Sequence, residues 1–172
     1  CFFLVVGVTN AQDANNPWAV ELGINAIDVY SSGNVDAGRL PVSVGGVDVK
    51  GRLFDEFFNV TDHYNIIPAV TKVAAARYLG DGFSFGVGGT MNKLTKLGDV
   101  RVDDLIYYAG DAELRYSLRD KIGGQWLDPS LGVGGGYTWV DDIGFGSVNA
   151  TAGVRFWVAE NLAINVQSTF KH

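Results

Sequence analysis

The strongest constraint in this chain is a strict alternation of apolar with small or polar residues, repeated through its second half in segments separated by short turns. In the clearest segment, residues 131–139, Leu131, Val133 and Trp139 share one parity, and the even positions are glycine or threonine. A period of two residues predicts a β-strand with one apolar face. Long strands of this kind, glycine-rich on one face and aromatic near their ends, are typical of the wall of a membrane-spanning barrel.

Seven segments fit this description. They cover residues 18–30, 66–78, 83–93, 106–118, 126–139, 148–158 and 162–170. Bacterial single-chain barrels have an even number of strands, and an open edge in lipid would leave backbone N–H and C=O groups unpaired. The sequence therefore predicts an all-β, antiparallel, up-and-down transmembrane β-barrel with eight strands in the full protein, seven of them visible and the eighth beyond His172.

The connections between these strands differ in length. Residues 79–82 and 159–161 are short turns, whereas residues 31–65 form a long loop. Because bacterial barrels keep short turns in the periplasm and longer loops outside, we expect the first strand to run outward and the 31–65 loop to lie at the cell surface. Within that loop, residues 42–49 predict a small hairpin around Gly-Gly, and residues 54–58 form an apolar cluster.

The N-terminal segment has a different character. Residues 1–8 form an apolar run that begins with Cys1, and small or polar residues follow it up to Ala11. This pattern predicts the remnant of a secretory signal peptide at residues 1–11, followed by a C-terminally incomplete barrel domain at residues 12–172. A lipid-modified Cys1 and an ordinary first strand are the alternatives. No later stretch reaches the ~18–20 apolar residues of a transmembrane helix.

Composition excludes several functional classes. The net charge of −6 argues against nucleic-acid binding, which normally requires a basic surface. With only two histidines and one cysteine, the chain offers no catalytic residues, no metal site and no cofactor site, so we do not expect an enzyme. The acidic residues of the outer loops lack the spacing of a calcium loop and are better interpreted as solvated side chains.

Aromatic residues gather near the predicted strand ends. Amphipathic rings prefer the boundary between lipid headgroups and acyl chains, so two such belts separated by one strand length are expected of a spanning barrel. The alternative is the general preference of aromatic residues for strands. The sequence predicts girdles formed by Trp18, Tyr30, Tyr78, Tyr108, Tyr116, Trp126, Trp139 and Trp157.

The opposite face of the predicted strands carries charges of both signs, and we assign Lys93 and Asp111 to it as well. An eight-stranded barrel has an interior just wide enough for side chains, and an unpaired charge there is costly. We therefore expect a structural lumen network of Glu21, Lys72, Glu113, Arg115 and Arg155, with inward glycines leaving room for the long side chains. A water or ion path, and a catalytic pair of Glu21 with Glu113, are the other interpretations.

Three features together resemble a known family: residues 11–20 (AQDANNPWAV), the glycine-rich strands, and residues 162–166 (LAINV). They resemble the N-terminal barrel of the outer membrane protein A family, in the form found in Bacteroidetes, over residues 12–172. The resemblance implies the outer membrane of a Gram-negative bacterium, with a peptidoglycan-binding periplasmic domain following in the full protein. It transfers no functional residue to this chain.

The leading hypothesis is a structural outer-membrane barrel with a charged, largely filled lumen, which anchors the cell envelope and displays loops. Its expected partners are membrane lipid, peptidoglycan through the following domain, and other envelope proteins through the 31–65 loop. The first alternative is a narrow porin or ion-conducting pore. The second is a soluble, lipocalin-like ligand-binding barrel, which would require an apolar interior.

Overall fold

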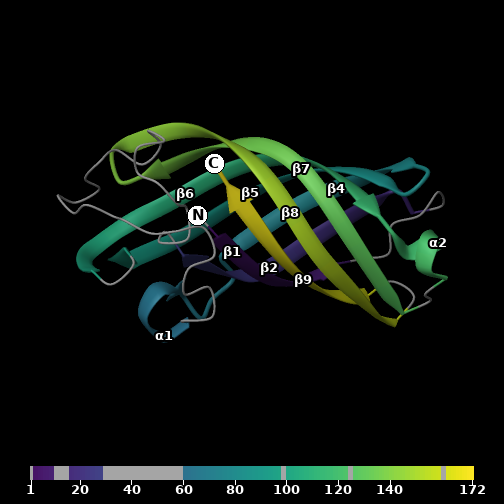
Figure 1. Ribbon diagram of the computed structural model, residues 1–172, viewed down its shortest axis with the longest axis horizontal. Helices are drawn as coiled ribbons and strands as arrows, with labels where there is room; N and C mark the ends of the chain where they lie inside the picture. Colours follow the sequence, from purple (N-terminus) through teal and green to yellow (C-terminus); the bar gives the residue numbers. More distant parts are fainter. Residues whose placement is uncertain (1, 10–15, 29–59, 98–99, 124–125, 160–161) are drawn as a thin grey trace.

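The computed structural model describes residues 2–9, 16–28, 60–97, 100–123, 126–159 and 162–172, and these form an all-β fold with two single-turn helices (Figure 1). The strands are β1 (Phe2–Thr9), β2 (Trp18–Asp28), β3 (Asn65–Ile66), β4 (Lys72–Gly80), β5 (Phe83–Leu97), β6 (Val100–Ser117), β7 (Leu127–Val140), β8 (Ile143–Ala159) and β9 (Leu162–Lys171). The helices are α1 (Val60–His63) and α2 (Arg119–Ile122). Neither of these helices is long and apolar enough to cross a membrane.

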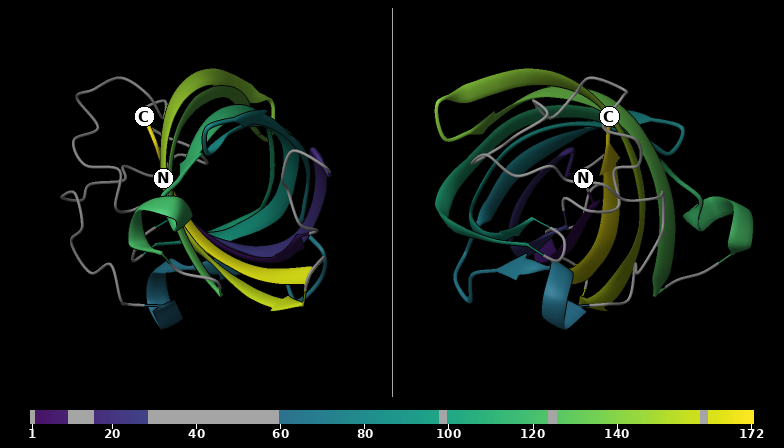
Figure 2. Two further views of the ribbon diagram at one scale, coloured as in Figure 1. Left: turned by 90° about the vertical axis from the view of Figure 1, so that its right-hand side faces the viewer. Right: turned by 60° about the vertical axis from the view of Figure 1, so that its left-hand side comes forward.

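Eight of these strands form an antiparallel wall that closes on itself. The hydrogen-bonded order is β1-β9-β8-β7-β6-β5-β4-β2, and β1 pairs again with β2. The short strand β3 adds to the edge of β2 beyond β4, where Ile27 faces Asn65. Viewed along its length, the wall surrounds a central space (Figure 2). The all-β, antiparallel, up-and-down architecture predicted from alternation is confirmed, because every neighbouring pair is antiparallel and the connections run up and down.

The eighth strand comes from the opposite end of the chain to the one predicted. The sequence places it beyond His172, and it assigns residues 1–11 to a leader remnant. In the structure, Phe2–Thr9 occupies the position between β9 and β2, and all eight of its residues pair on both sides. The physical reason is the open edge: β2 and β9 present unpaired backbone groups, and a segment rich in phenylalanine and valine satisfies both rows. Of the alternatives for this segment, the ordinary strand is the one the structure has.

The two faces of the wall are reversed relative to a water-soluble protein. Large apolar side chains lie on the outside, with Val133 63% and Trp18 62% exposed. Polar and charged side chains such as Glu21, Asn149 and Asn165 are buried on the inside. Exposed large apolar side chains occur on the outer face of most of the strands, whereas monomeric soluble proteins rarely expose large contiguous apolar patches. The alternating pattern therefore assigns residues to the two faces as predicted, and the charged residues lie inside the cylinder.

The two ends of the barrel differ. At the end that we call the α1 end, β5–β6 and β7–β8 meet in two-residue connections, and α1 and β3 lie beside them (Figure 1). The opposite end, the α2 end, carries the β4–β5 turn at Asp81-Gly82 and helix α2. Asp141 in the β7–β8 turn has a left-handed backbone (φ 53°), as the mirror-image turns of tight hairpins require.

Strand boundaries agree with the prediction within two residues at the α2 end and differ more at the α1 end, where β8 begins at Ile143 and the prediction begins it at residue 148. The predicted strand 66–78 is divided into β3 and β4, and Pro68 lies in the bend between them, because proline lacks the N–H that a ladder needs. Both β5 and β6 extend further than predicted toward the α1 end. Tyr30, the predicted hairpin 42–49 and the apolar cluster 54–58 lie outside the described residues.

Candidate functional site: the lumen

The lumen is the one place where the described residues gather buried charges from many strands. It has room for them because β7 presents glycine toward the inside at three alternate positions. A Cβ added to Gly136 would lie 2.1 Å from Asp111 Oδ1, and one added to Gly132 would lie 2.8 Å from the Glu113 carboxyl carbon. At Gly134 the obstacle is backbone, because the added atom would lie 2.2 Å from the carbonyl oxygen of Ala112. These glycines therefore give the carboxylates of β6 the space that they occupy.

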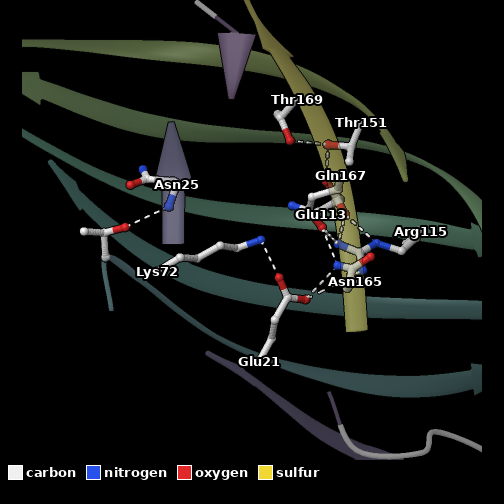
Figure 3. Close-up of polar contacts among 10 residues, drawn as sticks. Glu21, Asn25, Lys72, Glu113, Arg115, Thr151, Asn165, Gln167 and Thr169 are labelled. Atoms are coloured by element: carbon white, nitrogen blue, oxygen red, sulfur yellow. Dashed lines mark hydrogen bonds and ion pairs between the residues drawn. The ribbon is translucent and has the colours of Figure 1, made fainter. Parts of the chain in front are cut away.

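Four of the five residues predicted to pair in the lumen form one connected network (Figure 3). Lys72 Nζ lies 2.8 Å from Glu21 Oε1, and Arg115 Nη2 lies 2.8 Å from Glu113 Oε1. A longer contact of 3.9 Å from Arg115 Nη1 to Glu21 Oε2 joins the two pairs. All four side chains are less than one-fifth exposed. This part of the predicted lumen network is confirmed.

Amides and hydroxyls fill the remaining hydrogen-bonding positions of this network. Gln167 Oε1 accepts from Arg115 Nη2 at 2.9 Å and from Asn165 Nδ2 at 2.9 Å. Asn165 Nδ2 also donates to Glu21 Oε2 at 3.3 Å, and the Thr151 hydroxyl donates to Glu113 Oε2. A buried ion pair is stable only when such extra bonds offset the loss of hydration. β8 and β9 therefore supply the neutral part of the network, and β2, β4 and β6 supply the charges.

A second cluster lies further toward the α1 end. Lys171 Nζ lies 2.7 Å from both carboxylate oxygens of Asp111, and Asn149 Nδ2 donates to Asp111 Oδ1 at 2.8 Å. Alternation places Asp111 on the inner face, but the predicted network does not include this residue. The predicted last strand ends at residue 170, one residue before Lys171. The signal that could have found this pair is the parity of Lys171, which matches that of Asn165 and Gln167.

The fifth predicted residue, Arg155, belongs to a different cluster at the α2 end. Its Nη1 lies 3.6 Å from Asp128 Oδ2, and Asp128 also accepts a hydrogen bond from the Ser117 hydroxyl. The guanidinium lies over the ring of Trp157 at 5.6 Å from its centroid, and that of Arg119 lies over the same ring at 5.5 Å. Arg155 lines the same cavity as Glu113 and Lys72, but the carboxylate in contact with it is Asp128, which the prediction does not include. Asp128 precedes Pro129, so in the sequence it looks like a turn residue.

A cavity of about 80 Å³ remains beside the charges. One of its walls consists of small residues of β4 and β5, including Ala74, Ala76, Gly86 and Gly88. Its other lining residues include Glu21, Lys72, Asp111, Glu113, Arg115, Arg155 and Lys171. A space of this size and polarity can hold several water molecules or one small ion.

At the α1 end of the lumen apolar side chains form a cluster, and the hydrogen-bonded Asn25, Asn65 and Asn92 are buried beside it. Ile27, Leu94, Tyr107, Ala109 and Val140 form this apolar layer, and all five are at most 4% exposed. None of them lines the cavity among the residues that the structure describes. Beside the layer, Asn65 joins two strands: its Nδ2 donates to the carbonyl oxygen of Ile27 at 3.2 Å, and its Oδ1 accepts from the Lys96 N–H at 3.0 Å.

The aromatic residues predicted to form the girdles divide between the two faces of the wall. Trp18 and Trp126 are exposed on the outer face at the α2 end, and Tyr108 and Trp139 are exposed at the α1 end. Tyr116 lies on the same outer parity and packs against Phe83, with ring centroids 4.8 Å apart.

Two of the predicted girdle residues face inward instead. Tyr78 pairs directly with Ser84, which lines the cavity, so the two residues share the inner face. Trp157 follows Arg155 by two residues, and its indole nitrogen is buried. Both predictions fail for one reason: position near a strand end does not determine the face, whereas parity does.

The described residues contain no group of three or more His, Cys, Asp or Glu side chains that could hold a metal ion. Comparisons with protein-family models, with curated proteins and with solved structures found no match. The resemblance to the outer membrane protein A family therefore stays a prediction, and the lumen has to be interpreted from its own geometry.

Proposed function

We propose that this chain is a structural β-barrel of the outer membrane of a Gram-negative bacterium, where it anchors the cell envelope and displays surface loops. The observation that carries the proposal is the reversed burial: exposed Val, Leu, Ile and Trp side chains cover the outside, and charged residues fill the inside. Water would make such an exterior unfavourable by ~25 cal/mol for each Å² of apolar surface. Lipid removes that cost, and the closed wall leaves no backbone edge in the hydrocarbon.

The filled lumen supports an anchoring role over conduction. Ionic contacts span the interior at two levels, from Arg115 on β6 to Glu21 on β2 at 3.9 Å and from Lys171 on β9 to Asp111 on β6 at 2.7 Å. Beyond them the apolar layer of Ile27, Leu94, Tyr107, Ala109 and Val140 occupies the α1 end. A conducting pore needs a continuous polar path, and an apolar constriction opposes ion passage by excluding water. The lipocalin-like alternative needs an apolar interior, which is the opposite of the lumen described above.

The outer surface can be tested with brominated lipids, which quench only tryptophan that contacts acyl chains. The chain has four tryptophans, so four single-tryptophan variants can be made by replacing the others with phenylalanine. We expect shallow bromine to quench Trp18 and Trp139, which lie on the outer face near opposite ends. Trp157, which faces the lumen, is the matched control and should stay unquenched. A Val133→Trp variant, at mid-strand on the outside, should respond to deep bromine.

Two results would overturn the membrane assignment. One is equal quenching of Trp139 and Trp157 by every lipid, and the other is the intact chain remaining monomeric in buffer without detergent. Single-channel recording on the same vesicles separates anchoring from transport, for which the filled lumen predicts no resolved conductance. Discrete openings in the unmodified protein would favour the narrow pore instead.

A further inference from the structure

We propose that Arg77 and Trp18 form a binding site, on the outer face of the barrel, for the phosphate of an anionic phospholipid. The inference rests on the proposed membrane location and names the class of lipid that this surface prefers. It begins with an exposed cation on a face that is mostly apolar. Arg77 of β4 is exposed and pairs directly with Trp18 of β2, so the two side chains share the outer face.

Aromatic side chains flank Arg77 on both neighbouring strands. Its direct partner on β5 is Phe85, so one row across β2, β4 and β5 consists of Trp18, Arg77 and Phe85. The Arg77 guanidinium lies over the Trp18 ring, 5.6 Å from its centroid. Trp18 is 62% exposed and Phe85 is 45% exposed. The row therefore presents a cation between two rings at the α2 end of the outer face.

The other exposed cation at the described outward-facing positions of β2, β4 and β5 has a different environment. Lys93 lies on β5 at the α1 end, and its Nζ is 2.5 Å from Asp104 Oδ2. Arg77 has no carboxylate partner within the described part of the chain. Stacking on Trp18 uses the face of the guanidinium, whereas its five N–H donors lie in its plane. These donors are therefore available to an acceptor from outside the described residues.

The chemistry of this surface selects a phospholipid. Tryptophan and arginine side chains on a spanning barrel prefer the boundary where headgroups meet acyl chains. A guanidinium binds phosphate through paired, charge-assisted N–H donors. Two residues further toward the middle of the wall, Val20 and Val87 are 50% and 52% exposed and offer apolar contact to the acyl chains. A free phosphate has no such contact.

The charge of the headgroup determines which phospholipid the site prefers. The trimethylammonium group of phosphatidylcholine carries the same charge as Arg77, so it opposes a close approach of that lipid. Phosphatidylglycerol has one net negative charge and no cation. We therefore expect the site to prefer phosphatidylglycerol over phosphatidylcholine.

The first experiment measures lipid preference beside Trp18 by competition. The full chain, with every tryptophan except Trp18 replaced by phenylalanine, is placed in vesicles of brominated phosphatidylcholine mixed with unbrominated phosphatidylglycerol. Phosphatidylglycerol that occupies the site protects Trp18 from quenching by bromine. We expect its binding constant to exceed that of phosphatidylcholine by about fivefold, because one contact of a cation with an anionic headgroup contributes about that factor.

A pair of variants tests whether the preference belongs to Arg77. Arg77→Gln should remove it. Arg101→Gln, which removes an exposed arginine of β6 at the α1 end, is the matched control and should keep it. An equal loss in both variants would overturn the site, because net charge alone would then explain the preference. Quenching of Trp18 in proportion to the brominated fraction would refute the site and leave the membrane location intact, whereas no quenching of Trp18 would refute both.

The second experiment keeps the native side chain, so it does not depend on whether Arg77→Gln folds. The full chain is labelled with ¹⁵N-arginine in phosphatidylcholine bicelles, and the Nε–H resonance of Arg77 is followed as phosphatidylglycerol is added. A saturable shift at Arg77, with none at Arg101, supports the site. The proposal fails if the Arg77 resonance does not move, or if soluble glycerol phosphate moves it equally, because the ligand would then be a free phosphate.

Discussion

The middle of the lumen and its α1 end are both closely packed, but by different kinds of interaction. In the middle, Lys72, Glu21, Arg115 and Glu113 fill the interior with ion pairs and amide hydrogen bonds. At the α1 end the apolar layer fills it, including Ile27, Leu94 and Tyr107 at no more than 1% exposure. The two regions share strands β2 and β6, and on β6 the change occurs between Ala109 and Asp111.

The difference shows which interactions require exact positions and which do not. A buried ion pair balances a large desolvation cost against a Coulomb attraction, so it tolerates little displacement and little loss of a partner. Apolar packing is non-directional, and its cost on truncation depends on how far the neighbours can collapse. The glycines of β7 lie beside the polar middle, where the geometry is strict. We therefore expect the two regions to respond differently to the same size of change.

The largest effect should come from closing the space beside the polar network. Gly134→Ala would put a methyl group 2.2 Å from the carbonyl oxygen of Ala112, and the backbone of a paired strand cannot move aside without breaking the ladder. We expect a loss of about 3 kcal/mol or more in unfolding free energy, or failure to refold from urea. Gly110→Ala is the matched control, because its added carbon has no neighbour within 4 Å. Equal stability of the two variants would refute the strict geometry.

The next effect should come from removing one charge of the network. Glu113→Ala leaves Arg115 without its closest carboxylate, 2.8 Å away, inside the barrel. We expect a loss of about 3 kcal/mol, at the lower end for a broken buried pair because the adjacent cavity can hydrate the cation. The measurement is urea-induced unfolding in detergent, followed by fluorescence.

A double variant separates charge from packing. If the charge left behind causes the loss, Glu113→Ala combined with Arg115→Ala should cost less than the sum of the two single variants. An unchanged unfolding midpoint for Glu113→Ala would show that the polar middle contributes no more than a solvated surface pair.

A smaller effect is expected in the apolar layer. Leu94→Ala deletes a side chain that is 1% exposed and packs within the layer, so we expect a loss of about 2 kcal/mol, since the α1 end is open to collapse. The control is Leu131→Ala on the outer face, where the leucine is 57% exposed and detergent replaces the lost contacts. Leu131→Ala should cost less than half as much. A similar loss in both variants would mean that the layer is not a packed interior.

Sequence alone predicts the faces of this barrel well, because alternation at a period of two is a direct consequence of strand geometry. It places Glu21, Lys72, Glu113 and Arg115 inside, and the structure brings them together. It places Lys93 inside as well, and there it is wrong: Lys93 is 48% exposed and pairs with Asp104 on the outside. The parity of Lys93 matches that of Phe83 and Phe85, so a strict reading of the same rule would have placed it correctly.

What alternation does not provide is the identity of partners across the barrel. Asp128 and Arg155 meet because β7 and β8 pair in one particular register, and register depends on where the hairpin turns. The apolar layer is missed for a related reason. Its five members come from four strands, and each strand contributes only one or two inward apolar residues beyond a polar run. On one strand they look like exceptions, and they form a layer only when the strands are aligned. The source of the eighth strand also follows from closure, and closure is a property of the whole sheet.

The smallest effect is expected in the pH dependence of folding stability, at the rim of the α1 end, where Tyr64 is buried just before β3. Burial, together with the nearby negative charge of Asp28, raises the pKa of Tyr64 above its usual value. The unfolded chain then loses its proton at about pH 10, whereas the folded chain holds it to higher pH. Folding stability should therefore be complete below pH ~10 and should fall as the pH rises further through the folded pKa. Tyr64→Phe should flatten that decline in urea midpoints measured between pH 9 and 11, and Tyr108→Phe, on the exposed outer face, should leave it unchanged. An identical decline in both variants would mean that the α1 rim opens to solvent before the barrel unfolds.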